Sequence, residues 1–125
     1  MEISKDELVD SPEFFFAELG GLHDADIRVI TWNPEKRSVE IDVDDLNANF
    51  DGLPEYPGKR PAILAFGDVQ NLALNCDGQQ GDIQRVYRFK VLRNEISGQF
   101  EASLIFSPSG QLNFHFANVA VGKQD

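Results

Sequence analysis

Most of this chain alternates apolar and polar side chains, and that alternation restricts what it can fold into. Between residues 22 and 121, short alternating runs are separated by segments that contain glycine or proline. In one run, Val39, Ile41 and Val43 alternate with acidic residues. A period of two is typical of β-strands with one face in the core and one face in water. We therefore expect a mainly antiparallel sheet of about six strands.

The segment before this sheet predicts one short helix. Ser11 can cap it, Pro12 suits its first position, and Glu13 suits the positive end of the helix dipole. Gly20 and Gly21 predict its end, because glycine readily adopts the left-handed conformation of a C-terminal cap. Three consecutive phenylalanines lie inside the helix, so we expect it to pack deeply. The predicted fold class is α+β, with an N-terminal helix packed on the sheet.

The length of 125 residues fits a single globular domain spanning residues 1–125. A hydrophobic content of 42% and a charged content of 26% are typical of a folded protein. A chain of this size can bury a core without disulfide bonds. These properties exclude a multidomain enzyme, a repeat solenoid and a disulfide-stapled mini-protein.

Turn residues divide the expected sheet into strands. Pro34 predicts the turn of a hairpin formed by residues 22–32 and 38–43. Residues 62–77 predict strand structure with a bulge or bend at Gly67. Further along the chain, two more turns predict a three-stranded antiparallel meander, over residues 82–121. In its first strand we expect Tyr87, Phe89 and Val91 to share one face.

Residues 47–61 interrupt the alternation with three prolines and two glycines, which predict a long loop. Long loops in compact domains often carry function. Alternatively, Phe50, Leu53 and Tyr56 could fold back and cover the sheet. Both interpretations are open at this point.

The net charge of −10 is concentrated at the start of the chain, where residues 1–60 hold 15 acidic and six basic side chains. Such a field repels nucleic acid and anionic lipid, whose affinity for proteins comes largely from cationic side chains. It attracts a basic protein and accelerates the encounter with it. We therefore expect no nucleic-acid and no membrane partner. The alternative is that the acidity only keeps the protein in solution.

Motifs of the common catalytic classes are missing from the sequence, which has no nucleophile elbow, phosphate loop or dinucleotide fingerprint. Cys76 is the single cysteine, and alternation places it on an apolar face with Leu72 and Leu74, where a buried thiol is usually unreactive. A single cysteine forms no intrachain disulfide, as expected in a reducing compartment. The sequence predicts a protein that is not an enzyme.

The beginning of the chain has neither the basic nor the apolar region of a signal peptide. No apolar run approaches the ~20 residues that a membrane-spanning helix needs. We expect a cytoplasmic protein. Its oligomeric state does not follow from the sequence.

The stretch of residues 22–26 contains the residue types of a polar or metal site. His23, Asp24 and Asp26 could join His115 around a transition-metal ion or a polar substrate. In an extended chain, however, Asp24 and Asp26 project to one face and His23 to the other. No histidine or cysteine pair has the spacing of metal ligands. We favour hydrogen bonds from His23 and Asp24 that order the corner between helix and strand, and we predict no metal and no cofactor.

The first strand of the hairpin has apolar residues on both of its expected faces. Ile27 and Val29 fall on one face, and Arg28, Ile30 and Trp32 fall on the other. An exposed tryptophan beside an arginine, with acids on the next strand, would form a binding hot spot. The alternative is a sheet covered on both faces. The residues predicted to bind a partner are Trp32, Arg28, Glu40, Asp42, Asp44 and Tyr56.

The phenylalanine-rich helix, the corner over residues 22–27, the acidic hairpin and the turn at residues 107–110 resemble those of small uncharacterised bacterial proteins. Among these, the chain is most similar to the immunity-protein-fifty family of polymorphic toxin systems. The resemblance covers much of the chain through short motifs. It implies a bacterial protein that binds and neutralises a cognate toxin, and it implies no catalytic residues.

The preferred hypothesis is therefore a non-enzymatic, acidic protein-interaction module, with an immunity protein as its specific form. The first alternative is a small metal- or ligand-binding enzyme domain that uses His23, Asp24 and Asp26. The second is a structural homo-oligomer, formed through an exposed strand edge or through the face that carries Ile30 and Trp32.

Overall fold

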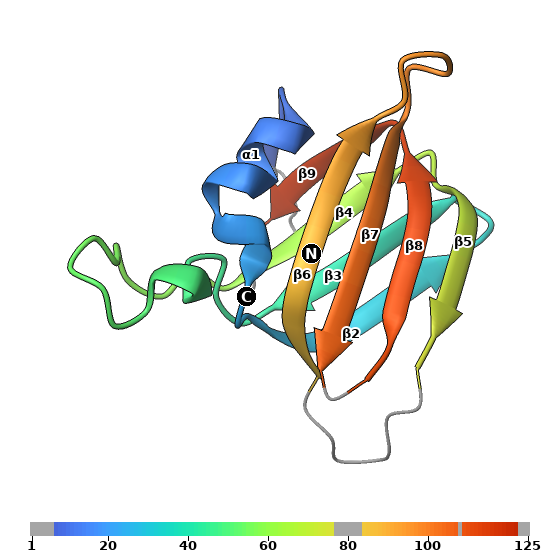
Figure 1. Cartoon of the computed structure of the whole chain (residues 1–125). Helices are drawn as coiled ribbons and strands as arrows, with labels where there is room; N and C mark the ends of the chain where they lie inside the picture. The colour runs from blue at the N-terminus through green and yellow to red at the C-terminus, as the bar shows by residue number, and fades with distance from the viewer. Residues whose placement is uncertain (1–6, 77–83, 108, 123–125) are drawn as a thin grey trace.

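The computed structural model describes residues 7–76, 84–107 and 109–122. These residues form one α-helix, two 3-10 helices and nine strands in one antiparallel sheet (Figure 1). The strand order is β1-β9-β4-β3-β2-β6-β7-β8-β5. In chain order the elements are β1 (Glu7–Leu8), α1 (Pro12–Glu18), η1 (Gly20–Leu22), β2 (Asp26–Asn33), β3 (Ser38–Val43), η2 (Ala48–Phe50), β4 (Ala62–Gly67), β5 (Gln70–Asn75), β6 (Gln84–Arg93), β7 (Phe100–Ser107), β8 (Gln111–Phe116) and β9 (Asn118–Gly122).

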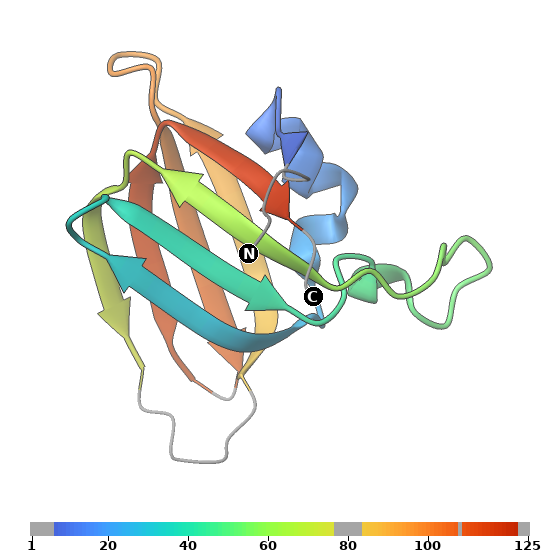
Figure 2. The same cartoon turned by 180° about the vertical axis from the view of Figure 1, so that it is seen from behind.

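The sheet folds over on itself into two layers, as Figures 1 and 2 show from opposite sides. The front layer contains β6, β7, β8 and β5, and the back layer contains β2, β3, β4 and β9. Among the described residues, the layers are joined where β2 pairs with β6, at Asp26 with Arg85 and Ile27 with Gln84. We call this short pairing the seam. The core lies between the layers.

Helix α1 lies at the side of the two layers, next to β6 (Figure 1). Its buried Phe16 contacts Phe89 of β6 edge-to-face, with ring centroids 4.7 Å apart, and lies 6.2 Å from Phe66 of β4. The predicted helix is confirmed, but Phe14 is 63% exposed, so the helix is less deeply packed than expected. Ser11 occupies the N-cap position without a side-chain capping bond. No helix of the described residues is long and apolar enough to cross a membrane.

Glycine ends α1 as predicted. The backbone of Gly21 has φ +65°, a conformation that favours glycine. A Cβ atom at this position would also lie 3.0 Å from the carbonyl oxygen of Phe89. The close approach of this turn to β6 therefore depends on a residue without a side chain.

The described residues contain nine strands, three more than the sequence predicted. The predicted hairpin of β2 and β3 and the predicted meander of β6, β7 and β8 are confirmed. The bend predicted at Gly67 divides its segment into β4 and β5, and these two strands join opposite layers. β1 and β9 are two short strands that the sequence did not predict. β9 follows the meander in the chain but pairs with β4 and β1 of the back layer. Alternation identifies strands, but it does not show when one run changes layer.

A bulge in β2 corrects the predicted faces of that strand. The register shifts between Ile27 and Val29, so Ile30 pairs with the buried Ile41 of β3 and packs against the core. Ile27 and Ile30 therefore face inward, and Val29 faces solvent. Trp32 follows Ile30 on the inner side and is still 40% exposed, because it lies near the end of the hairpin.

Two further face predictions were wrong. A bulge between Val86 and Arg88 places Tyr87 in solvent, whereas Phe89 and Val91 are buried as expected. Cys76, predicted to lie on a buried apolar face, is exposed. It follows β5, which is the last strand of the sheet and therefore leaves most of its side chains uncovered.

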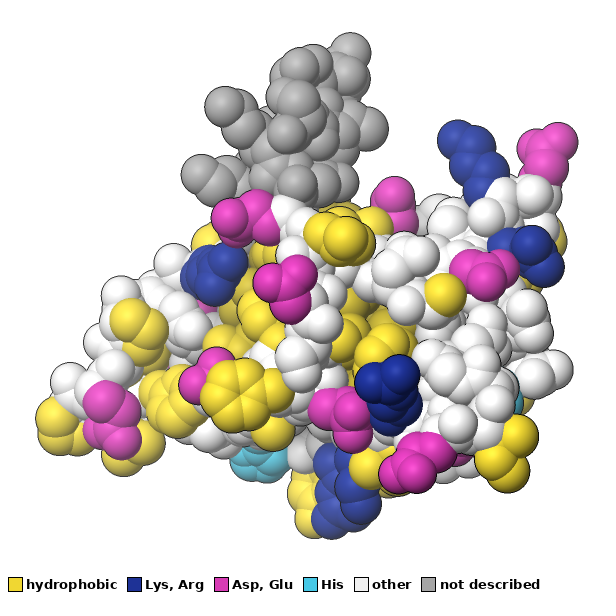
Figure 3. Space-filling model, turned by 90° about the horizontal axis from the view of Figure 1, so that it is seen from above, with side chains coloured by type: hydrophobic (Ala, Val, Ile, Leu, Met, Phe, Trp, Pro, Cys, Tyr) yellow, Lys and Arg dark blue, Asp and Glu magenta, His cyan; other side chains and the backbone are white. Residues whose placement is uncertain are grey.

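Some large apolar side chains remain at the surface. In Figure 3 hydrophobic side chains gather in the middle and at the left of the face seen from above, with acidic side chains among them. Leu8 and Phe14 line a hollow of about 330 Å³ between β1 and α1, beside acidic Glu7, Asp10 and Glu18. This side of the molecule is thus a mixed apolar and acidic surface.

Candidate functional site

A polar cleft of about 380 Å³ opens at the seam between the two layers. It is built from the corner before β2, the end of β3, the long loop that follows β3, and the start of β6. We call it the acidic cleft. Its lining residues are Asp24, Asp26, Asp44, Asp45, Ala48, Asp51, Tyr56, Lys59 and Arg85.

The corner between η1 and β2 brings two of these aspartates to the seam. Asp24 has a positive φ of 73°, and its backbone N–H donates to the carbonyl of Val86, 2.9 Å away. The backbone N–H of Asp26 donates to Asp44 Oδ1 at 2.7 Å, which ties the start of β2 to the end of β3. These two bonds come from backbone N–H groups, and they tie the corner to β6 and to the segment that follows β3.

An ion pair crosses the seam. Arg85 Nε donates to Asp26 Oδ1 at 2.9 Å, where β6 meets β2. The hydrogen bond and the charge of Asp26 raise the pKa of the Arg85 guanidinium. Because both side chains are partly exposed, solvent weakens the attraction between them. The main effect of the ion pair is to hold the Arg85 side chain in one place.

Asp45 organises the long loop from beneath. Asp45 is buried, with only 6% of its surface exposed. Oδ1 accepts hydrogen bonds from the backbone N–H groups of Asn47 and Arg60, both at 2.9 Å, and Oδ2 accepts one from the Tyr56 hydroxyl at 2.6 Å. One carboxylate thus fixes the beginning, the middle and the end of the loop. The loop itself projects away from both layers (Figure 2).

Tyr56 is held at the cleft as a neutral phenol. The hydrogen bond to the Asp45 carboxylate, with smaller contributions from burial and from nearby aspartates, raises the pKa of Tyr56 from 10.0 to about 12. Ionisation of this phenol would place a second negative charge against Asp45. Leu53, in contrast, is exposed, so this part of the loop does not fold back over the sheet.

We expect the raised pKa of Tyr56 to make the fold sensitive to alkali. The bond to Asp45 contributes its full stability below pH 10. This contribution is lost as the pH rises from 10 through 12, because in that range the Tyr56 phenol ionises more readily in the unfolded than in the folded protein. In urea unfolding at several pH values, the free energy of unfolding should fall more steeply with rising pH for the unsubstituted protein than for Tyr56→Phe. Tyrosinate absorbance of Tyr87→Phe, which retains one tyrosine, should rise near pH 12. A rise near pH 10 would contradict the prediction.

Negative charge dominates the cleft. Five aspartates against Lys59 and Arg85 leave an excess of three negative charges. Arg85 is already paired with Asp26, and Asp45 is held by its three donors. Asp24 and Asp51 are exposed at the surface of the cleft, so a cationic group could reach them.

The structure brings together four of the residues singled out from the sequence and separates the others. Asp24, Asp26, Asp44 and Tyr56 line the acidic cleft. Trp32 lies near the other end of β2, on its inner side. Glu40 and Asp42 pair with outward-facing residues of β2 and therefore lie on the outer face of the back layer, and Arg28 falls at the bulge. The predicted hot spot is thus divided among separate surfaces.

The two histidines lie in different surroundings. His23 Nδ1 is 3.4 Å from Asp24 Oδ2, and its ring is near Tyr87. His115 is in β8, where its Nδ1 is 3.3 Å from the side-chain nitrogen of Asn71. In the described part of the chain, no group of three or more His, Cys, Asp or Glu side chains could hold a metal ion.

Sequence reasoning missed Asp45, Asp51, Lys59 and Arg85 as parts of the cleft. The signal for Asp45 was present: a second aspartate follows the alternating strand immediately, at the start of a proline-rich loop. Asp and Asn at such positions commonly bond the backbone of the turn that follows. Arg85 gave no comparable signal, because its place depends on the long-range pairing of β6 with β2.

Comparison with models of known protein families finds no match, and comparison with curated proteins finds none either.

Proposed function

We propose that this protein is a non-enzymatic interaction module that binds a basic protein through its acidic cleft. The observation that carries the proposal is the convergence of five aspartates from three separate chain segments on one cleft beside Tyr56. Complementary charge accelerates association, and an aromatic side chain fixed next to the charges supplies contact area at little entropic cost. The net charge of −10 adds a long-range attraction for such a partner.

The cleft suits an arginine or lysine side chain that projects from the partner. Asp24 and Asp51 would receive the charge, while Asp45 keeps Tyr56 in position. The specific form of the proposal is an immunity protein whose partner is a toxin. It rests on the resemblance of the corner and the acidic hairpin to those of the immunity-protein-fifty family. It rests also on the complementary charge of a basic toxin and the acidic cleft.

The test compares two doubly substituted variants with the same change in charge. In Asp24→Asn/Asp51→Asn the cleft loses two charges, and in Glu35→Gln/Glu95→Gln two exposed glutamates outside the cleft are neutralised. Immobilised protein is used to capture partners from lysate of the source organism. We expect a basic protein to be retained by the native chain and by the glutamate variant, and released by salt. Its association with the cleft variant at low salt should be about tenfold slower.

Three results would oppose the proposal: no basic protein retained, equal retention by both variants, or retention that does not depend on salt. If the captured protein has toxic activity, the native chain should abolish it and the cleft variant should do so less efficiently. A captured basic protein without such activity would support the interaction module and contradict the immunity form.

A further inference from the structure

The front layer ends at β5, which has no strand on its outer side among the described residues (Figure 1). All residues of β5 except Leu72 are exposed. In an edge strand, the backbone N–H and C=O groups that point away from the sheet are not used by the sheet, so they can pair with a further strand. The outer edge of β5 is therefore an exposed row of hydrogen-bonding groups.

Natural proteins protect such edges with charged residues, with very short strands or with covering segments. This chain does so elsewhere. β1, at the opposite end of the sheet, is two residues long and contains Glu7. Helices α1 and η1 lie against β6 beyond the seam, and β2 carries Arg28 there. β5, in contrast, is six residues long and contains neither a charged residue nor a proline.

The region around the β5 edge is electrically neutral. Although 26% of the chain is charged, β5, β8 and the whole of residues 102–122 contain no Asp, Glu, Lys or Arg. Asp68, which precedes β5, forms an ion pair with Arg37 at 3.3 Å. Two copies with a net charge of −10 each repel one another, and this repulsion is weakest where two neutral edges meet. The edge of β5 is thus suited to a second copy of the same chain.

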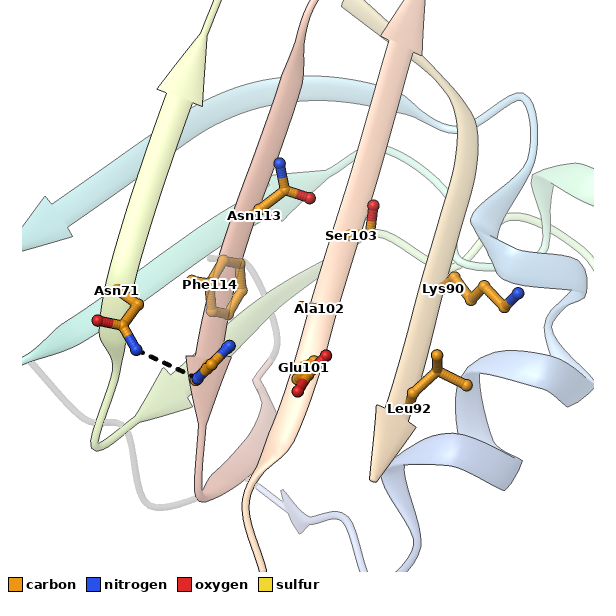
Figure 4. Close-up of a pocket in the computed structure, with 9 residues that line it drawn as sticks. Asn71, Lys90, Leu92, Glu101, Ala102, Ser103, Asn113 and Phe114 are labelled. Carbon is orange, nitrogen blue, oxygen red and sulfur yellow. Dashed lines mark hydrogen bonds between the residues drawn. The ribbon is translucent and has the colours of Figure 1, made fainter. Parts of the chain in front are cut away.

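Contacts within the molecule hold β5 in place. The side-chain nitrogen of Asn71 lies 3.3 Å from His115 Nδ1 of β8, as the dashed line in Figure 4 shows. The N–H of Val69 donates to the carbonyl of Arg37 at 2.8 Å, which ties the turn before β5 to the turn between β2 and β3. The edge is therefore already formed in the monomer, and a strand that pairs with it need not order it first.

The regular part of β5 defines the centre of a pairing with a second copy. The register with β8 shifts between Gln70 and Ala73, and it is regular from Ala73 to Asn75. Leu74 is the midpoint of this regular stretch and is 52% exposed. A two-fold axis at Leu74 places the leucines of two antiparallel strands opposite each other, about 4.5–5.5 Å apart at Cβ.

We propose that β5 pairs antiparallel with β5 of a second copy of this chain, about a two-fold axis at Leu74. The front layers of the two molecules then form one continuous sheet. The pairing occupies the β5 edge of both copies, so association stops at the dimer. The inference goes beyond the proposed function, because β5 shares no residue with the acidic cleft.

The test measures the association of the full chain by sedimentation equilibrium, from micromolar to millimolar concentration, with two matched variants. Leu74→Glu and Leu92→Glu make the same change in charge at leucines that are 52% and 51% exposed. Leu92 lies on β6, which β7 and β8 separate from β5 (Figure 4). We expect a monomer–dimer equilibrium. Leu74→Glu should raise the dissociation constant of the dimer at least about tenfold, because two carboxylates would face each other, and Leu92→Glu should change it less than about twofold.

The response to salt separates this pairing from binding at the acidic cleft. Added salt screens the repulsion between two acidic molecules, so the dimer should become tighter as the salt concentration rises. Capture of a basic partner by the cleft should become weaker under the same conditions. Failure of one proposal therefore leaves the other to be judged on its own result.

Cys76 provides a direct measure of the pairing. It is the single cysteine of the chain, it is exposed, and it lies two residues beyond Leu74. In the proposed dimer, the two Cys76 Cα atoms are about 15 Å apart, given the rise along a strand and the spacing between strands. A bismaleimide of that reach should link two copies of the unsubstituted protein and of Leu92→Glu, and should link Leu74→Glu much less.

Circular dichroism spectra of the two variants that match the unsubstituted protein will show that they are folded, and cross-linking of the unsubstituted protein tests the pairing without any substitution. The proposal is overturned if the chain stays monomeric at high salt and millimolar concentration, if both substitutions weaken the dimer equally, or if salt dissociates the dimer. Dimers that the bismaleimide does not link, or growth into larger oligomers, would also contradict it.

Discussion

Replacing Phe66 with alanine is expected to lower the free energy of unfolding by about 3–5 kcal/mol, a large part of what a domain of this size has. Phe66 lies on β4 at the centre of the core. Its ring centroid is 4.9 Å from that of Phe116, 5.0 Å from that of Phe114 and 6.1 Å from that of Phe89. The ring connects the back layer with the front layer, so its removal leaves a cavity that the paired strands cannot close. Urea unfolding followed by circular dichroism measures the loss.

Phe14→Ala is the matched control for this prediction. It removes the same atoms from a side chain that is mostly exposed, so we expect a change within about 0.5 kcal/mol. If Phe66→Ala cost no more than Phe14→Ala, the aromatic cluster would not be what holds the layers together. An unfolded Phe66→Ala protein would agree with the prediction, and Phe66→Leu, which fills more of the space, would then give a measurable midpoint.

Asp45→Ala is expected to destabilise the fold by about 2–4 kcal/mol. The substitution removes the acceptor of three hydrogen bonds, two from backbone N–H groups and one from Tyr56, and bonds to a charged acceptor are stronger than neutral ones. Partial access of water to the loop keeps the loss below the sum of three buried bonds. Thermal or urea unfolding measures this effect, and amide exchange of Asn47 and Arg60 should become faster.

Asp51→Ala provides the control, since it makes the same change in charge on the same loop at an exposed position. We expect it to change stability by less than about 0.5 kcal/mol. Tyr56→Phe should fall between the two variants, because it removes one of the three bonds. Equal effects of Asp45→Ala and Asp51→Ala would mean that loop charge, and not the hydrogen bonds of Asp45, determines stability here.

Alternation predicted the strands well and their faces less well. Val39, Ile41 and Val43 are buried as the pattern required, since β3 lies without a bulge between β2 and β4. The assignments for Val29 and Tyr87 were wrong because one extra residue in a strand reverses the faces of the residues that follow it. Bulges arise from the pairing of two strands, and a single strand's residue pattern does not reveal them.

Local motifs predicted only part of the acidic cleft. Asp24 and Asp26 were recognised together because they are close in sequence, and Tyr56 was proposed separately as an aromatic anchor. The relation between Tyr56 and Asp45 depends on how an eleven-residue span of loop closes, and Arg85 reaches the site from a strand distant in the chain. Contacts of this kind are set by tertiary structure, so the sequence could suggest the chemistry of the site and not its assembly.

Because the acidic cleft lies at the seam, binding of a ligand in the cleft is linked to the stability of the fold. Mutual repulsion among the aspartates acts beside the pairing of β2 with β6, where Arg85 and Asp26 also form an ion pair. A cation that settles there relieves the repulsion, and a ligand that binds only the folded chain stabilises it by mass action. The protein should therefore melt at its highest temperature when the cleft is filled, which would make heat resistance a reporter of the partner's presence.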